Sequence, residues 1–245
     1  MTQVLELRAL RVTAGAETAD EAPFRLEVPA LALGRADCVA LTGASGCGKS
    51  TLLEVLALLR SPERAARFAL RLDPERPSID LTQPGDRAHL RRGPIGYVPQ
   101  SGGVLPFLTA RMQVEAVLHL AGQAASDTAR QRLNRLSHAL ELDAHLGKRR
   151  TELSGGQRKR VALLTGLAVP RALLIADEPT AGLDAANAAR VMQVLKRIAQ
   201  QDQSAVLIAT HDTEAARQAG FDIVAILGGH LAPRLAPDGQ ELRHG

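Results

Sequence analysis

The chain has 245 residues, of which 45% are hydrophobic, 23% charged and only 2% aromatic. This length and composition are ordinary for a globular α/β protein whose core is built from aliphatic side chains. The formal net charge is +4. Because the basic clusters are short and aromatic residues for base stacking are nearly absent, we expect no nucleic-acid partner.

The sequence gives no sign of membrane insertion or secretion. No apolar run approaches the roughly 18 residues of a membrane-spanning helix, and the N-terminal segment around Glu6 lacks the apolar core of a signal peptide. The two cysteines, Cys38 and Cys47, indicate a reducing compartment. A short predicted strand holds them about 16 Å apart, whereas a disulfide needs Cα atoms within about 7 Å. We therefore expect a cytoplasmic location, no membrane span and two free thiols.

The N-terminal part of the chain predicts strands. Apolar and charged residues alternate around Leu5 and again around Leu26, which is typical of half-buried antiparallel strands. Residues 38–42 form a short apolar run that ends in a glycine-rich loop, and residues 50–59 predict a helix. Residues 60–94 hold many charges and five of the thirteen prolines, and indicate an irregular or edge-sheet region.

The remainder of the chain alternates strand and helix patterns. We predict strands at 95–98, 172–176, 205–209 and 223–227. We predict two helices within 110–142, one after Gly156, and others at 188–201 and 214–219. This alternation favours an α/β fold of the P-loop NTPase kind: a mostly parallel sheet, an N-terminal antiparallel β region and an inserted α-helical subdomain.

A phosphate-binding motif follows the strand at 38–42. The segment Gly43-Ala-Ser-Gly-Cys-Gly-Lys-Ser fits the pattern G-x-x-x-x-G-K-[ST] between a predicted strand and a predicted helix. Its glycines let the backbone wrap a phosphate, and N–H groups at the helix N-terminus supply positive potential. Lys49 would reach the β- and γ-phosphates. The residues expected to bind ATP are Gly43, Ala44, Ser45, Gly46, Cys47, Gly48, Lys49, Ser50 and Thr51.

The phosphate-binding motif alone leaves alternatives open. A chance glycine-rich turn is one, and kinases, GTPases and many ATPases share the pattern. A second motif narrows the choice: Leu173-Leu-Ile-Ala-Asp-Glu ends an apolar strand with Asp177 and Glu178. Asp177 is a Mg²⁺ ligand candidate together with Ser50, and Glu178 a general-base candidate. Two acids after a strand can also be a loop or a helix cap.

Four further motifs complete a pattern. Leu153-Ser-Gly-Gly-Gln precedes a predicted helix and in isolation could be a helix N-cap with Ser154 as the capping residue. Together with the motifs above, in this order, it resembles the signature of ABC ATPases. The expected signature residues are Leu153, Ser154, Gly155, Gly156 and Gln157. Gln100 resembles the Q-loop glutamine, Asp184 the D-loop aspartate and His211 the switch histidine of that family.

The resemblance implies a composite site for ATP and Mg²⁺. In ABC ATPases two subunits dimerise head to tail when ATP binds, with each ATP between one P-loop and the other subunit's signature. The resemblance assigns catalysis to Glu178, His211 and Gln100. It assigns the metal to Ser50, Asp177 and Gln100.

The resemblance covers nearly the whole chain. It implies a single ABC ATPase domain over 1–245, with 1–99 and 155–245 as the core and 100–154 as the helical subdomain that ends in the signature. The segment from Gln100 to about residue 108 would transmit motion to an integral membrane permease, because family members dock a permease helix beside it. The protein would then be peripheral on the inner face of the cytoplasmic membrane.

Within the family, Ile175-Ala-Asp-Glu-Pro-Thr and Leu105-Pro-Phe-Leu-Thr are similar to the lipoprotein-release and macrolide-export group. Transport-free signalling or envelope machinery is an alternative, and so is a soluble ABC ATPase of another process. Soluble ABC ATPases of other processes either insert long coiled coils between the phosphate-binding motif and the signature or carry two ATPase halves in one chain. Here Lys49 and Leu153 stand only 104 residues apart.

Three features depart from the family pattern. Residues 11–15 contain no aromatic to stack on adenine, although Arg11 or Phe24 could take that place. Thr165 stands where the family often has an arginine, and residues 60–94 are diverged.

Overall fold

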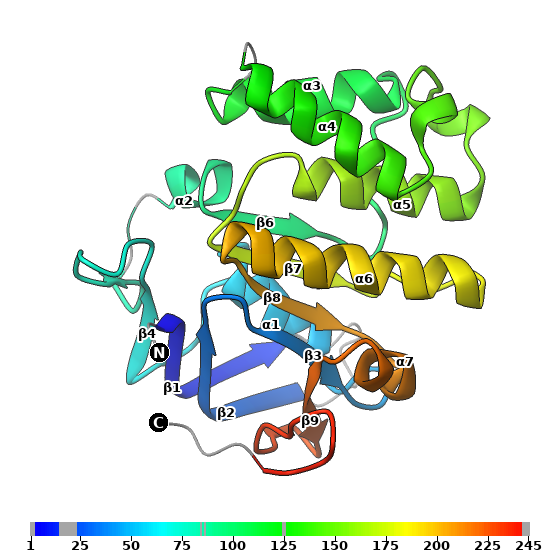
Figure 1. Ribbon diagram of the computed structural model, residues 1–245. Coiled ribbons are helices and arrows are strands. Elements are labelled where there is room, and N and C mark those ends of the chain that lie inside the picture. Colours follow the sequence, from blue (N-terminus) through cyan, green and yellow to red (C-terminus); the bar gives the residue numbers. More distant parts are fainter. Residues whose placement is uncertain (1–2, 15–23, 84, 86, 124–125, 242–245) are drawn as a thin grey trace, which may run out of the picture.

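The computed structural model describes residues 3–14, 24–83, 85, 87–123 and 126–241 (Figure 1). The strands are β1 (Gln3–Ala14), β2 (Phe24–Gly34), β3 (Cys38–Thr42), β4 (Arg67–Leu70), β5 (Ile79–Asp80), β6 (Ile95–Val98), β7 (Leu173–Asp177), β8 (Ala205–Ala209), β9 (Asp222–Leu227) and β10 (His230–Leu231). The helices are α1 (Lys49–Leu56), α2 (Ala88–Arg92), α3 (Ala110–Leu120), α4 (Asp127–Ala139), α5 (Gly155–Leu167), α6 (Ala185–Asp202) and α7 (Thr213–Gln218). Two short 3₁₀ turns, at Asp143–His145 and Arg150–Glu152, precede α5.

The strands form one mixed sheet in the order β5-β4-β1-β2-β10-β9-β3-β8-β7-β6. Strands β6, β7, β8, β3 and β9 run parallel to one another, whereas β1 pairs antiparallel with β2 and β4. The predicted α/β fold with an N-terminal antiparallel region is therefore confirmed. This order places β3 between β9 and β8, with the carboxyl ends of β3, β8, β7 and β6 along the same edge, where ligands bind in open α/β sheets.

Both faces of the parallel part are buried, as such sheets require. In β3, Val39 and Leu41 face one apolar cluster that includes α1, whereas Cys38 and Ala40 face the cluster beneath α5 and α6. The same alternation runs through the neighbouring strands, with Leu173 on one face and Leu174 on the other. This explains why each strand reads as an unbroken apolar run in the sequence.

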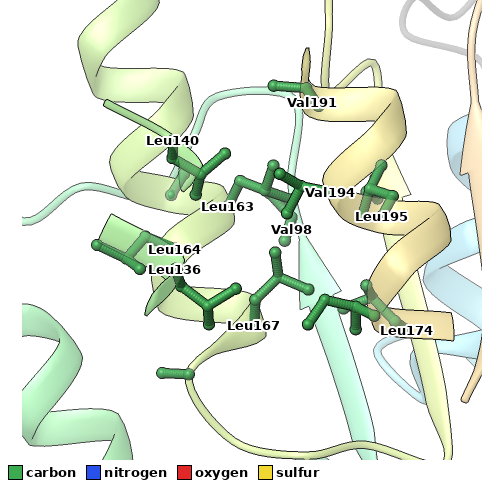
Figure 2. Close-up of a cluster of buried hydrophobic side chains, with 14 of the residues drawn as sticks. Val98, Leu136, Leu140, Leu163, Leu164, Leu167, Leu174, Val191, Val194 and Leu195 are labelled. Carbon is green, nitrogen blue, oxygen red and sulfur yellow. The ribbon is translucent and has the colours of Figure 1, made fainter. Parts of the chain in front are cut away.

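Helix α5 lies between the sheet and the outer helices (Figure 1). It contacts β6 and β7 on one side, and α3 and α4 on the other. Figure 2 shows Leu163 and Leu167 of α5, Val194 of α6, and Val98 and Leu174 of the sheet in one apolar cluster. The position of α5, and with it the Leu153–Gln157 motif at its start, is thus fixed by packing on two sides.

Helix α1 is shorter than predicted. It ends at Leu56 rather than at residue 59, because Leu58 adopts a left-handed conformation with φ 60° and its N–H bonds to the carbonyl of Val55. The sequence does not predict strand β10 or the individual elements within residues 60–94, which are β4, β5 and α2. Strand β4 pairs with β1, and β5 pairs with β4 at the edge of the sheet.

Cys38 and Cys47 are both free. Within the described residues, no helix combines the length and the apolar character needed to cross a bilayer.

Candidate functional site

The P-loop, residues 43–51, connects β3 to α1 and contains the nine residues expected to bind ATP. The ammonium group of Lys49 folds back over the loop and donates hydrogen bonds to the carbonyls of Gly43 at 2.8 Å and Ala44 at 2.9 Å. Gly48 is the N-cap of α1 and has no side chain to occupy the first N–H groups of the helix. Those groups are therefore directed at the space where a phosphate would lie.

Two positions of the P-loop accept only glycine. A Cβ on Gly43, whose φ is 148°, would lie 2.7 Å from Sγ of Cys47. A Cβ on Gly48, whose φ is 100°, would lie 2.6 Å from the ring of Phe24. The spacing of the motif thus reflects close approaches of the loop backbone to its own side chains and to β2.

Asp177 ends β7 and is only 4% exposed. Burial raises the pKa of its carboxyl group, and a hydrogen bond from the Ser50 hydroxyl opposes that shift. A carboxylate beside a hydroxyl fits Mg²⁺, which is usually held by one or two protein oxygens together with substrate phosphates. The described residues contain no group of three His, Cys, Asp or Glu side chains that could hold a metal alone. This donor set therefore fits a cation shared with a nucleotide.

Glu178 and His211 come from neighbouring strands and meet at the carboxyl edge of the sheet. The His211 Nδ1 atom lies 2.9 Å from Oε2 of Glu178. Glu178 has a left-handed φ of 50°, and its N–H bonds to the carbonyl of Ala209 at 3.0 Å. Its side chain is 11% exposed, whereas that of His211 is 70% exposed. The backbone therefore fixes the carboxylate, and the histidine reaches it from the solvent side.

Gln100 lies two residues beyond the end of β6, close to the two acids. It lines a small pocket of about 10 Å³ together with Asp177 and Glu178. Lys159 of α5 also lines this pocket, a contribution that the motifs did not predict. In the sequence, the only sign of this contribution is a lysine two residues after the Leu153–Gln157 motif. The structure thus brings Gln100, Asp177 and Glu178 to one place.

The Leu153–Gln157 motif forms the exposed start of α5. The Ser154 hydroxyl accepts from the N–H of Gln157 at 3.2 Å, and the Gln157 side chain accepts from the N–H of Ser154 at 2.9 Å. This capping box fixes the first turn, while Leu153 is buried beneath it. The simple helix-cap interpretation is therefore correct for Ser154 within one chain. Because Ser154 is also exposed, its capping role does not exclude a contact with another molecule.

The D-loop lies against the start of α5. Asp184 caps α6 by accepting from the N–H of Asn187 at 2.8 Å, and these hydrogen bonds hold the pKa of Asp184 below its usual range. A Cβ on Gly156 would lie 3.0 Å from Cδ2 of Leu183. The signature and the D-loop therefore touch within a single chain.

Gln113 is a buried polar residue that sequence reasoning missed. Its side chain accepts from the N–H of Leu105 at 2.7 Å and donates to the hydroxyl of Thr165 at 3.3 Å. Thr165 also donates to the carbonyl of Val161 in α5. Gln113 stands beside Val114 on the apolar face of α3. In the sequence, the signal for its role is a polar residue on an otherwise apolar helix face. It ties the segment after Gln100 to α5.

The chain is similar to known proteins over most of its length. A family model described as ABC transporter matches residues 26–181. The lipoprotein-releasing system ATP-binding protein LolD 1 of Caulobacter vibrioides is 34% identical over 220 residues, which cover 90% of this chain and 91% of that protein. The macrolide export ATP-binding/permease protein MacB of Syntrophobacter fumaroxidans is 38% identical over 198 residues, which cover 80% of this chain. The chain spans 27% of the length of that protein.

A solved structure supports the same assignment. The ATP-binding cassette MJ0796, in a dimeric post-hydrolysis state bound to ADP and Pi, superposes with a TM-score of 0.81 at 28% identity. The match covers 98% of this chain and all of that one. The chain therefore belongs to the ABC transporter family, as an ATP-hydrolysing, nucleotide-binding cassette similar to the lipoprotein-releasing and macrolide-export ATP-binding proteins.

Proposed function

We propose that this chain powers a bacterial inner-membrane complex of the lipoprotein-release or export type. Two copies close on ATP and transmit the motion of closure and hydrolysis to integral membrane permease subunits, which hold the protein at the cytoplasmic face of the membrane. The observation that carries the proposal is the meeting of Gln100, Asp177 and Glu178 in one pocket. Gln100 also begins the segment that runs beside a groove, described below as the candidate permease contact. The three residues therefore connect the site of hydrolysis to that segment. Residues 100–154 act as the helical subdomain in this proposal, against a core of residues 1–99 and 155–245.

The chemistry is transfer of the γ-phosphoryl group to water. The water oxygen bonds to the γ-phosphorus, the bond to the bridging oxygen of the β-phosphate breaks, and Glu178 accepts the proton. His211 orients the Glu178 carboxylate through their 2.9 Å contact. Lys49 exchanges its loop carbonyls for phosphate oxygens when nucleotide binds. Ser50, Asp177 and Gln100 are the residues that would hold Mg²⁺, which would neutralise charge on the phosphates.

The exposed start of α5 completes the site of a second copy. Ser154 and Gly155 are exposed, and the N–H groups of the first turn point outward at the positive end of the helix. The cassette MJ0796 is dimeric in its ADP-bound structure. In our proposal two copies therefore meet head to tail, with ATP between the P-loop of one and Ser154 of the other.

A groove beside the segment after Gln100 is our candidate for the permease contact. It has a volume of about 320 Å³, and its lining includes Tyr97, Val117 and Ala162. Two leucines of its lining, Leu59 and Leu120, are 57% and 64% exposed, so part of the groove's lining is apolar and open to solvent. The groove therefore suits the apolar face of a helix.

The charge of the groove indicates the chemistry of that helix. Arg91, Arg92 and Arg171 line it, and in the described part of the chain their hydrogen bonds go to backbone carbonyls. Burial lowers the pKa of Arg171 to about 10. A cytoplasmic permease helix with an apolar stripe and flanking carboxylates would complement this lining.

Co-purification tests the proposal. The tagged protein is isolated from detergent-solubilised membranes of its host, and associated proteins are identified by mass spectrometry. We expect a protein with a few transmembrane helices and a large periplasmic domain. Leu120→Glu should lose this partner and keep ATP binding, because it places a charge in the apolar lining. The matched control is Gln131→Glu, which adds the same charge on the exposed side of α4 and should keep the partner.

Two results would contradict this account. If no protein with transmembrane helices associates with the wild type, the role in a membrane complex is wrong and a soluble ABC ATPase is favoured. If Leu120→Glu retains the same partner as Gln131→Glu, the partner binds elsewhere and the groove is not its site.

A further inference from the structure

We infer, building on the head-to-tail site proposed above, that His145 is a positioning residue for the exposed start of α5: its neutral ring holds the side chain of Gln157, and Gln157 holds Ser154. His145 ends the 3₁₀ turn Asp143–His145 and is half-buried. Its Nε2 atom lies 3.2 Å from Nε2 of Gln157. The histidine stands eight residues before Leu153, outside every motif of the sequence.

The capping box fixes which way the Gln157 amide points. Its Oε1 atom accepts from the N–H of Ser154 at 2.9 Å, so its NH₂ group is the end that faces the ring of His145. An NH₂ group only donates hydrogen bonds, and the ring nitrogen opposite it must therefore accept. An accepting Nε2 carries no proton. His145 thus makes this contact in its neutral form, with the proton on Nδ1.

The other ring nitrogen of His145 gives no support to a charged form. Nδ1 is enclosed and lacks a hydrogen-bond partner in the part of the chain that the structure describes. A charged imidazole donates from both nitrogens, and burying it without acceptors is unfavourable. Here Nδ1 has no acceptor and Nε2 faces a donor. The surroundings of the ring therefore favour the neutral form.

Positive charge dominates around the ring. Residues 140–160 contain the carboxylates of Glu141, Asp143 and Glu152, and the basic side chains of Lys148, Arg149, Arg150, Arg158, Lys159 and Arg160. Burial and the charges of Lys148 and Arg160 lower the pKa of His145 below its ordinary value.

The three carboxylates near the ring have other partners. Asp143 accepts from the Ser137 hydroxyl at 2.6 Å, and Glu152 accepts from the N–H of Arg149 at 2.8 Å. Glu141 lies 3.4 Å from the guanidinium group of Arg160. These partners leave the cations as the charges that act on His145, which keeps the ring neutral at neutral pH.

A proton on Nε2 of His145 would set two donors against one acceptor. The ring and the N–H of Ser154 would then both need Oε1 of Gln157, which lies toward Ser154. If the amide stays, its NH₂ group faces an N–H group of the ring; if it turns over, the N–H of Ser154 loses its acceptor. One of the two hydrogen bonds of the amide is lost either way. Because the pKa is lowered, the contact is complete above about pH 6.5 and is lost as the pH falls through that lowered pKa.

The contact bears on turnover because Gln157 holds Ser154 at two points. Besides the amide contact, the N–H of Gln157 donates to the Ser154 hydroxyl at 3.2 Å. In the proposed dimer Ser154 meets the ATP held by the other copy, whereas Lys49 holds the ATP of its own chain. Loosening the first turn of α5 should therefore slow hydrolysis and leave ATP binding to the P-loop intact.

Steady-state ATP hydrolysis by the purified protein tests this role of His145. His145→Phe keeps a flat ring that cannot accept a hydrogen bond. We expect its kcat to fall by roughly two- to ten-fold, the usual worth of one hydrogen bond. Equilibrium dialysis with ATP in the absence of Mg²⁺ should show unchanged binding. His145→Gln supplies an accepting oxygen on a side chain of similar reach, and should restore kcat at about pH 8.

The pH profile distinguishes positioning from packing. Glutamine does not titrate, so His145→Gln should keep its activity where the wild type loses it. The ratio of kcat for His145→Gln to kcat for the wild type should rise by roughly two-fold or more between about pH 8 and pH 5. Groups that titrate in both proteins, such as Glu178 and His211, cancel in this ratio. The matched control is His119→Gln, which replaces an exposed histidine of α3 and should follow the wild type at every pH.

Three results would overturn the inference. Wild-type turnover by His145→Phe would show that Gln157 needs no acceptor. Equal kcat values for His145→Gln and His145→Phe would show that the ring acts by packing alone. A ratio that does not change with pH would show that the proton on the ring is not linked to turnover. If His145→Phe does not fold, the ratio for His145→Gln decides. If the wild type itself does not hydrolyse ATP, the proposed function fails instead.

Discussion

In our proposal Glu178 is the general base, and its surroundings support this role beyond its position in a motif. Its N–H is fixed to Ala209, and His211 approaches its carboxylate to 2.9 Å. Glu178→Gln keeps the size of the side chain but cannot accept a proton. We expect ATP turnover to fall by about 10²–10⁴-fold while ATP binding is retained. Phosphate release measures the rate, and equilibrium dialysis with ATP measures binding.

A matched control distinguishes the role of Glu178 from a general loss of charge. Glu214→Gln removes an exposed carboxylate on α7, near the same edge of the sheet, and should hydrolyse ATP at the wild-type rate. Turnover by Glu178→Gln comparable to that of Glu214→Gln would show that another group accepts the proton.

The two cysteines should differ sharply in reactivity. Cys38 is 7% exposed, and burial raises the pKa of its thiol to about 11, so little thiolate forms at neutral pH. Cys47 lies in the P-loop and is partly exposed. We expect N-ethylmaleimide to add once, at Cys47, and bound ATP to slow the reaction. Intact-mass spectrometry counts the adducts, and Cys47→Ser should show none. Two adducts, or equal rates with and without ATP, would contradict this.

At the scale of elements, one buried ion pair joins the outer helices to the core. Arg132 of α4 contacts Asp202 at the end of α6, with Nη1–Oδ1 at 2.9 Å, and its Nε donates to the carbonyl of Leu167 in α5 at 2.8 Å. Both side chains are about nine-tenths buried. Removing one partner leaves a buried charge alone, which typically costs about 3–5 kcal/mol. Arg132→Ala should lower the free energy of unfolding by about that amount.

The same helix provides the control for Arg132. Arg130 pairs with Asp127 at the surface, where both side chains are more than two-thirds exposed. Arg130→Ala should cost less than about 1 kcal/mol, because solvent screens exposed pairs. Urea denaturation measures both variants. Equal losses would show that the Arg132 pair does not couple α4 to α6.

The same scale shows which elements could be predicted from sequence. Strand β8 was predicted with its observed bounds, Ala205–Ala209, because a short apolar run buried on both faces has a clear pattern. Strand β4 was not, because it is defined by pairing with β1, far away in sequence. The end of α1 was placed three residues late, because nothing local indicates that Leu58 turns left-handed.

The candidate site also has a part that could be predicted from the sequence and a part that could not. The P-loop, Asp177 and Glu178 could be predicted because each lies at a fixed distance from the end of a strand. The contact of Phe24 with Gly48 could not, because it depends on the strand order that brings β2 beside β10 and the P-loop. Gln113 was missed because its role depends on Leu105 and Thr165, which come together only when α3 packs on α5. Local spacing therefore predicts the phosphate end of the site, and tertiary packing decides the rest.

At the scale of the whole molecule, the central claim is that two copies share each ATP. The P-loop and the exposed start of α5 are separate surfaces of one chain, and our account makes them opposite walls of one site. Lys49→Ala removes the phosphate contact on one wall. Ser154→Arg blocks the other wall and should spare ATP binding. Each variant alone should be inactive.

Mixing the two variants tests this claim most directly. In a mixed dimer one site carries both substitutions, whereas the other keeps Lys49 and Ser154 intact. At equal amounts, half of the dimers are mixed and each has one working site, so we predict recovery of up to about a quarter of the wild-type ATPase rate. Phosphate release is measured for each variant, for their mixture and for the wild type at the same total concentration. A mixture as inactive as its two components would contradict the shared site.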